Sequence, residues 1–173
     1  MKLKTKRLLL RSIEPGDWKR LTEIWADFGR SEYAKYDAPH SLDDAEAKIK
    51  AARWAAASQG REHVFVSVCL GDVMIGLLDF HSNEAGYECG YCFHSDYHGQ
   101  GYAKESLRAM MDRLSDGRRT RFVVGTALDN TPSVRLLRSL GFSLVATEKV
   151  SFYRDTNGEK IWFPGGVFAL EKP

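Results

Sequence analysis

Two segments in the first third of the chain carry hydrophobic residues at helical spacing. Residues 15–28 place large apolar side chains three and four positions apart, which predicts an amphipathic helix. The alanine-rich segment 42–58 predicts a second helix, which Gly60 ends. The spacing of Ser41 and Asp44 favours Ser41 as the N-cap of this second helix.

From residue 62 onward the hydrophobic pattern changes to alternation, which is typical of strands with two different faces. Farther along, Pro132 suits the first turn of a helix and Gly141 suits its end. The predicted elements are a strand at 3–13, helices at 15–28 and 42–58, strands at 63–70, 73–81 and 86–94, a helix at 103–114, a strand at 121–128, a helix at 130–142, and strands at 143–154 and 160–171. This order predicts a mixed α/β (α+β) architecture in which helices pack on one sheet.

The composition suits one globular domain over residues 1–173. Hydrophobic residues make up 43% of the chain and charged residues 28%, with a formal net charge of +2. The basic residues are spread rather than clustered, so we expect no nucleic-acid partner. The leucine run near the N-terminus stops at Arg11 and no apolar run is long enough for a membrane span. We therefore expect a cytoplasmic protein without a membrane partner.

The three cysteines, Cys69, Cys89 and Cys92, lie in apolar, strand-like runs. No histidine stands at metal-ligand spacing to them, so we expect neither a zinc site nor a disulfide framework. The simplest interpretation is that they are small buried hydrophobic residues in a reducing compartment.

The stretch DYHGQGYAKES, residues 96–106, joins the third alternating strand to the following helix. Gly99 and Gly101 would let an anion such as a phosphate approach backbone N–H groups at the positive end of the helix dipole. The alternative is a tight turn that uses glycine only for its backbone angles. The stretch lacks the GK[ST] ending of a Walker loop and the third glycine of a dinucleotide fingerprint, so it predicts neither of those nucleotide sites.

Several segments resemble the GNAT superfamily of N-acetyltransferases, in the branch that includes ribosomal-protein-alanine and spermidine N-acetyltransferases. HGQGYA is similar to the acetyl-CoA loop pattern Q/R-x-x-G-x-G/A, within the longer match ECGYCFHSDYHGQGYAKES. TKRLLLR, NTPSVRLLRSLGF and GVFAL resemble the family's first strand, a later helix and the last strand, so the similarity covers almost the whole chain in order. It implies the GNAT fold: a central, mostly antiparallel sheet of about seven strands, splayed between the fourth and fifth and flanked by about four helices.

The resemblance also implies acetyl-CoA as the co-substrate. The residues that it assigns to acetyl-CoA are Cys92, Phe93 and His94 on the strand, His98, Gly99, Gln100, Gly101, Tyr102 and Ala103 in the loop, and Asn130 before the later helix. Backbone N–H groups at 92–94 would polarise the thioester carbonyl, and the pantetheine arm would pair with the strand edge. His98 stands where the family has Arg or Gln, so a fixed charge near the pyrophosphate is missing, and Lys104 is a replacement.

Three residues are candidates for the proton transfers that the resemblance implies, and no metal is needed. Glu88 lies where many relatives carry a glutamate and is the candidate general base, with Asp79 and His81 as alternatives on the preceding strand. Tyr153 and Ser133 compete as the acid for the leaving thiolate. A phenol matches the pKa of a thiolate more closely, whereas a serine would act chiefly as a hydrogen-bond donor.

We therefore expect an acyltransferase that moves acetyl from acetyl-CoA to a primary amine by direct attack in a ternary complex. A protein N-terminus, a polyamine and another small amine all stay open as acceptors, and a homodimer is compatible with the resemblance. A non-catalytic acyl-CoA-binding or sensing domain of the same fold is the alternative, which the departure at His98 supports. A small-molecule or RNA-binding module without a cofactor is a third hypothesis, disfavoured by the absence of an aromatic RNA-reading motif.

Overall fold

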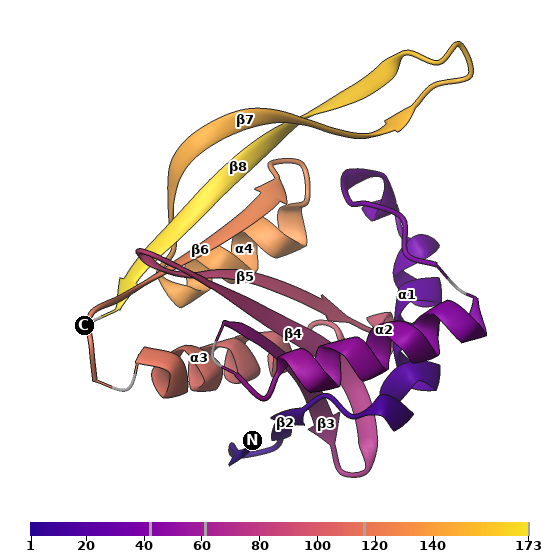
Figure 1. Cartoon of the computed structure of the whole chain (residues 1–173). Coiled ribbons are helices and arrows are strands. Elements are labelled where there is room, and N and C mark those ends of the chain that lie inside the picture. Colours follow the sequence, from indigo (N-terminus) through magenta and orange to yellow (C-terminus); the bar gives the residue numbers. More distant parts are fainter. Residues whose placement is uncertain (42, 61, 116, 173) are drawn as a thin grey trace.

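Figure 1 shows the computed structural model of the chain, which describes residues 1–41, 43–60, 62–115 and 117–172. Within these residues, eight strands form one sheet in the order β1-β2-β3-β4-β5-β6-β8-β7. The strands are β1 (Lys2–Lys4), β2 (Leu9–Ser12), β3 (His63–Leu70), β4 (Val73–Asn83), β5 (Gly86–Phe93), β6 (Thr120–Ala127), β7 (Ser143–Arg154) and β8 (Lys160–Lys172). The helices are α1 (Trp18–Gly29), α2 (Asp44–Ala57), α3 (Tyr102–Ser115) and α4 (Thr131–Leu140), with short 3-10 turns η1 (Pro15–Asp17), η2 (Ala34–Tyr36) and η3 (Ser95–Tyr97).

The sheet opens between β5 and β6, and this opening confirms the predicted splay between the fourth and fifth predicted strands. All other strand pairs are antiparallel, but β5 and β6 are parallel and pair only at residues 86–88 and 121–123. At Gly86 the backbones of β5 and β6 lie so close that an added Cβ would collide with the carbonyl oxygen of Arg121. Beyond Glu88 this edge of β5 pairs with no other strand of the described residues. An extended ligand can therefore pair with it.

The single strand predicted over residues 3–13 is wrong in one respect, because it is two strands joined by a tight turn. β1 pairs with β2 so that Lys2 lies opposite Arg11. The turn is closed by Thr5, whose N–H donates to the Leu8 carbonyl at 3.0 Å and whose Oγ1 accepts from the Leu8 N–H at 3.0 Å. A threonine side chain that bonds nearby backbone competes with the strand ladder, and the turn has no glycine or proline to reveal it. It raises the strand number from the expected seven to eight.

The cap of α2 also differs from the prediction. Asp43, rather than Ser41, is the N-cap, and its carboxylate accepts from the N–H groups of Ala45 and Glu46. The Ser41 hydroxyl instead accepts from the N–H of Asp43 at 3.2 Å. A carboxylate at this position satisfies free N–H groups and also meets the positive end of the helix dipole.

Helices cover both faces of the sheet. On one face α1 and α2 bury Leu21, Ile24, Trp25 and Ala51. On the other face α3 and α4 bury a larger cluster, which includes Leu107, Met110, Met111 and Leu137. The side chains of β5 alternate between the two clusters, since Cys89 and Phe93 face α3 and α4 whereas Cys92 faces α1 and α2. Cys89 and Cys92 are spaced as C-x-x-C but point to opposite faces, and both are free thiols.

The last two strands form a long hairpin that extends past the body of the sheet toward η2 (Figure 1). The ring of Tyr36 on η2 packs edge-on against the ring of Phe163 on β8, with 4.8 Å between the centroids. The hairpin and η2 thus lie together at the α1 side of the opening. Within the described parts of the chain, no helix is both long enough and apolar enough to cross a membrane.

Candidate active site at the opening of the sheet

The free edge of β5 presents the backbone of alternate residues. His94 donates its N–H to the Ile75 carbonyl on β4 at 3.0 Å, and Phe93 lies opposite Gly76. In an antiparallel ladder the residues next to such a bond turn their N–H groups the other way. Phe93 and Tyr91 therefore direct their N–H groups toward the opening, whereas those of Cys92 and His94 belong to the β4 ladder. Of the three residues predicted as oxyanion donors, Phe93 has the suitable orientation.

The loop after β5 and the start of α3 leave a run of backbone donors free. Gly99 and Gly101 have φ angles of 72° and 81°, a left-handed conformation that favours glycine. The helix begins with the bond from the Glu105 N–H to the Gly101 carbonyl. None of the N–H groups of residues 99–104 donates to another described residue. Free N–H groups at a helix N-terminus bind anions, so this segment has the properties of a phosphate cradle.

Two side chains of the predicted loop site bond to the protein itself. The Nε2 of His98 lies 2.9 Å from the Phe93 carbonyl oxygen, so this imidazole is turned toward the end of β5. The Nε2 of Gln100 donates to the Asp96 carbonyl at 3.1 Å. Both bonds shape the loop. The His98 side chain points back to β5 and does not extend from the loop as a cation would.

Arg7 supplies the loop with a guanidinium group that the sequence motifs did not reveal. Its Nη1 donates to the Gln100 carbonyl at 2.9 Å, and its Nε donates to Glu105 at 2.7 Å. Its Cζ lies 4.5 Å from the centre of the Tyr102 ring. An added Cβ on Gly101 would lie 3.5 Å from Nη2, which has no bond to another described residue. Arg7 therefore connects the β1–β2 turn to the loop and leaves one of its nitrogens beside Gly101.

Two further residues of the predicted cofactor set begin α3. The ring of Tyr102 is buried in the core, 9% exposed, so this residue offers the loop its backbone rather than its hydroxyl. Ala103 is half-buried, and its small side chain packs against the same core. Lys104, the predicted replacement for a cation at His98, is also half-buried in the first turn of α3.

Ser133 and Asn130 lie together at the start of α4, across the opening from β5. The Oδ1 of Asn130 accepts from the Ser133 N–H at 3.3 Å, which makes Asn130 the N-cap. The amide nitrogen of Asn130 has no bond to another described residue and can donate to a ligand. The Ser133 hydroxyl lies 2.7 Å from the hydroxyl of Tyr91 on β5. Burial raises the pKa of Tyr91 to about 12, although its bond with Ser133 opposes this effect.

Tyr153, the other candidate acid, is held at a different place. Its hydroxyl donates to the Ala34 carbonyl on η2 at 3.1 Å. Desolvation, and then the charge of Asp37, raise the pKa of Tyr153. Tyr153 and Ser133 thus have separate partners, with Tyr153 at the α1 side of the opening and Ser133 on the α4 side.

Glu88 lies among other ionisable groups on the α1 and α2 side of the sheet. It is exposed and stands opposite His81 in the β4–β5 register. His81 lies 3.1 Å from Asp79 and 2.9 Å from the ring nitrogen of His63. The bond with Asp79 raises the pKa of His81, with a smaller contribution from Glu88. Asp79 extends over Gly90, where any Cβ would touch its carboxylate.

Carboxylates also surround the thiol of Cys92. Burial raises the pKa of Cys92 to about 12, and the charges of Asp37, Asp27 and Asp79 add to the rise. Asp27 itself is fixed, because it accepts from the N–H and hydroxyl of Ser95 at 2.7 and 2.9 Å. Arg30 lies 3.4 Å from Asp27 and His81 lies 3.1 Å from Asp79, so Asp37 is the carboxylate of this group without an ion pair to another described residue. Together the three carboxylates can attract a cation to the α1 side of the opening.

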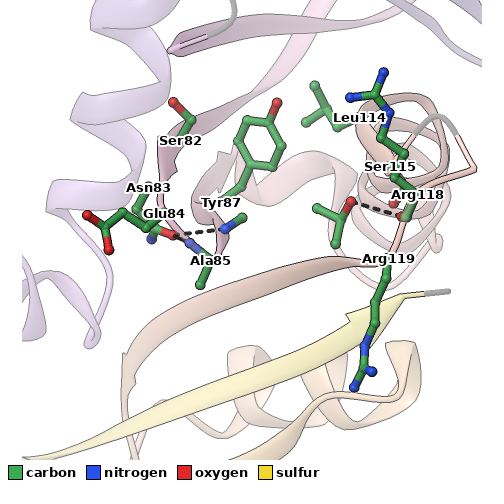
Figure 2. Close-up of a pocket in the computed structure, with 11 residues that line it drawn as sticks. Ser82, Asn83, Glu84, Ala85, Tyr87, Leu114, Ser115, Arg118 and Arg119 are labelled. Carbon is green, nitrogen blue, oxygen red and sulfur yellow. Dashed lines mark hydrogen bonds between the residues drawn. The ribbon is translucent and has the colours of Figure 1, made fainter.

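A separate hollow lies at the other end of β5 (Figure 2). It is lined by the β4–β5 turn and the start of β5, including Asn83 and Tyr87, and by Ser115 at the end of α3 and Arg118 after it. The Asn83 side chain there closes the turn by accepting from the N–H groups of Ala85 and Gly86. This hollow adjoins the paired end of β5 and β6, whereas the free edge begins beyond Glu88. It belongs to a different part of the molecule from the candidate site.

Comparison with known proteins agrees with this geometry. Residues 7–143 match the family described as acetyltransferase (GNAT) domain. The uncharacterized N-acetyltransferase YnaD of Bacillus subtilis (strain 168) is 27% identical over 144 residues, which are 82% of each chain. RimL, a ribosomal L7/L12 alpha-N-protein acetyltransferase in complex with coenzyme A, has 20% identity and a TM-score of 0.82, covering 99% of this chain and 98% of its own.

The microcin C7 self-immunity acetyltransferase MccE, in complex with acetyl-CoA and AMP, has 14% identity and a TM-score of 0.80, covering 97% of this chain and 94% of its own. These two solved structures show a shared fold. The match over residues 7–143 covers most of the chain, including the free edge of β5, the cradle and the start of α4. The chain therefore belongs to the GNAT family of acetyltransferases, and its class of activity is acyl transfer.

Proposed function

We propose that this protein transfers acetyl from acetyl-CoA to a primary amine by direct attack in a ternary complex. The observation that carries the proposal is the run of free backbone N–H groups at residues 99–104, next to the free edge of β5. One feature suits a pyrophosphate and the other suits an extended amide-containing arm. RimL and MccE, which share the fold, were crystallised with coenzyme A and with acetyl-CoA, and this supports the choice of cofactor.

Different residues of the chain would bind different parts of acetyl-CoA. The N–H groups of residues 99–104 bind the phosphates, and Arg7 holds the loop in place. The amide of Asn130 and the open edge at Tyr91 bind the pantetheine arm. Acetyl-CoA supplies an acyl group that is already activated as a thioester.

Three groups of the chain then assist the transfer. The Phe93 N–H donates to the thioester carbonyl oxygen, where negative charge develops. Glu88 accepts the proton that the acceptor amine must lose, directly or through water. Beside Glu88, Asp79 and His81 stay the alternative bases, and the bond between them raises the pKa of His81. The Ser133 hydroxyl donates a hydrogen bond to the departing sulfur.

The acceptor is a cation in its resting state, and it enters from the α1 side. Asp27, Asp37 and Asp79 favour an ammonium group there. The rings of Tyr36 and Phe163 at the same side can contact such a group. This chemistry fits a protein N-terminus, a polyamine or another small primary amine.

Two measurements on the wild-type protein test the proposal. Acetyl-CoA should raise the melting temperature, and one member of a panel of amines and N-terminal peptides should release free thiol from acetyl-CoA. A melting shift without thiol release from any amine would favour the non-catalytic acyl-CoA-binding alternative. The absence of a shift at millimolar acetyl-CoA would contradict both.

A further inference from the structure

The hydroxyl groups of Tyr91 and Ser133 meet across the opening of the sheet. Tyr91 lies three residues beyond Glu88, the last residue of β5 that pairs with β6. Ser133 lies in the first turn of α4, which follows β6 directly. Their oxygens are 2.7 Å apart, so one hydrogen bond spans the two sides of the opening. The side chain of Tyr91 packs in the cluster that faces α3 and α4.

The two hydroxyls carry two protons, but their mutual hydrogen bond needs only one of them. Each hydroxyl carries one proton, and neither oxygen bonds to any other described residue. One proton is shared between them, so the other is left without an acceptor in the described parts of the protein. Ser133 is 8% exposed and its hydroxyl lies at the opening, so a ligand or a water molecule there can accept this proton.

The direction of the shared bond follows from the chemistry of the two groups. A phenol is a stronger donor than an aliphatic alcohol, because its conjugate base is more stable. The pKa of Tyr91, about 12, keeps the phenol protonated over the neutral range. The backbone of Ser133 is fixed by the bond from its N–H to Asn130. Tyr91 therefore donates, and the rotatable hydroxyl of Ser133 must point its own proton elsewhere.

We propose that Tyr91 is a positioning residue that turns the Ser133 hydroxyl proton toward the sulfur of the leaving thiol. The proposal rests on the proposed acetyl transfer. As the C–S bond breaks, its electron pair stays on sulfur, and the Ser133 hydroxyl donates a hydrogen bond to it. A thiol is more acidic than a phenol, so the sulfur leaves as a thiolate and takes a proton from water. The amine gives its protons to Glu88 and water, and the balance is one proton released per turnover.

The mutual bond also makes the Ser133 hydroxyl a stronger donor. Hydrogen bonds in a chain polarise one another, so an oxygen that accepts a proton donates its own more strongly. Tyr91 thus contributes direction and strength without touching the sulfur. A purely structural role would instead be limited to closing the gap between β5 and α4.

The test compares Tyr91→Phe with Tyr87→Phe, each of which removes one hydroxyl from β5. Tyr87, which Figure 2 draws, has a hydroxyl with no bond to a described residue. Its ring packs against Phe80 and Phe122, so it is a matched control. Tyr91→Phe should lower kcat about tenfold and leave the KM for acetyl-CoA within about twofold. Tyr87→Phe should keep the wild-type kcat.

A double-mutant cycle with Ser133→Ala separates positioning from structure. If Tyr91 acts through Ser133, the double variant should be no slower than Ser133→Ala alone. Additive losses in the double variant would overturn the proposal, as would a kcat for Tyr91→Phe equal to that of Tyr87→Phe. A loss of kcat that only follows the folded fraction, measured from the melting curve, would equally overturn it. In each of these cases an active wild type leaves the proposed function intact, whereas an inactive wild type contradicts both.

Discussion

Arg7 and Glu105 form an ion pair between residues that are 98 positions apart, with 2.7 Å between Nε and Oε2. Glu105 also accepts from the hydroxyl of Thr5 and from the N–H of Arg7. Burial by itself would raise the pKa of Glu105, but these hydrogen bonds outweigh it and lower the pKa. The first turn of the chain is thereby attached to the first turn of α3, where we propose that the phosphates bind.

Arg7→Ala should weaken the binding of acetyl-CoA by about three- to fivefold, since Arg7 is partly exposed and its main effect is to order the loop. Arg20→Ala is a matched control, because Arg20 also donates to a backbone carbonyl, that of Met74, and pairs with a carboxylate, Glu23. Isothermal titration with acetyl-CoA measures both. Equal affinities for the two variants would show that Arg7 does not order the cradle.

Gly101→Val should abolish the melting shift that acetyl-CoA produces in the wild type. A β-branched residue at φ 81° strains the backbone, and its side chain would crowd the cradle. Gly158→Val introduces comparable strain, about 1–3 kcal/mol, at φ 84° in the β7–β8 turn. Both variants should melt earlier than wild type, but only Gly158→Val should still respond to acetyl-CoA. A full response in Gly101→Val would refute the cradle.

Glu88→Gln should reduce kcat about a hundredfold and leave the affinity for acetyl-CoA unchanged, because it removes the base and keeps the shape. Its activity should rise with pH as free amine becomes available. Glu84→Gln, in the β4–β5 turn, is the control, since Glu84 is exposed on the same hairpin. Steady-state rates with the best acceptor of the panel are the measurement. A wild-type rate in Glu88→Gln would show that Glu88 is not the base, and Asp79→Asn would then be the next variant to measure.

Tyr153→Phe distinguishes the two candidate acids. The Tyr153 hydroxyl is bonded to the Ala34 carbonyl on η2, next to the side from which the acceptor enters. We expect the KM for the acceptor to rise severalfold while kcat stays within about threefold of wild type. A kcat as low as that of Ser133→Ala would instead mean that the Tyr153 hydroxyl acts at the leaving sulfur.

Asp17→Asn should lower the free energy of unfolding by about 3 kcal/mol at pH 7, because it removes one member of a buried ion pair. Asp17 accepts from both terminal nitrogens of Arg11, at 2.7 and 2.6 Å, and from the Ser67 hydroxyl at 2.8 Å. Burial alone would raise its pKa, but these bonds and the N–H of Glu14 lower it.

The lowered pKa fixes the pH dependence of this effect. The contribution of Asp17 to stability is present above its unfolded pKa of about 4 and is lost as the pH falls through the folded value. Urea denaturation at pH 7 and pH 3 should therefore show a smaller difference between wild type and Asp17→Asn at the lower pH. A difference that does not change with pH would mean that the ionised pair contributes nothing.

The local pattern of the sequence determined most elements, their order and the glycine loop before α3 that we propose as the phosphate cradle. Alternation over 63–94 and the helical spacing after Gly101 depend on neighbouring residues, because strand and helix periods are properties of short segments. The GNAT resemblance extended these predictions to the splay and to the residues along β5 and α4. The β4–β5 pairing then showed that the N–H group of Phe93 faces the opening whereas those of Cys92 and His94 face β4, because N–H direction alternates along a strand.

Only the tertiary structure decided which side chains meet. The turn at Thr5 depends on one side-chain bond with Leu8 in place of glycine or proline. Arg7 bonds to the loop at Gln100, and the partner of Ser133 is Tyr91, 42 residues earlier. Contacts between residues so far apart depend on how the sheet closes and where it opens, and no short segment contains that information. The same long-range packing places Tyr153 beside η2 and brings the hydroxyls of Tyr91 and Ser133 together across the gap.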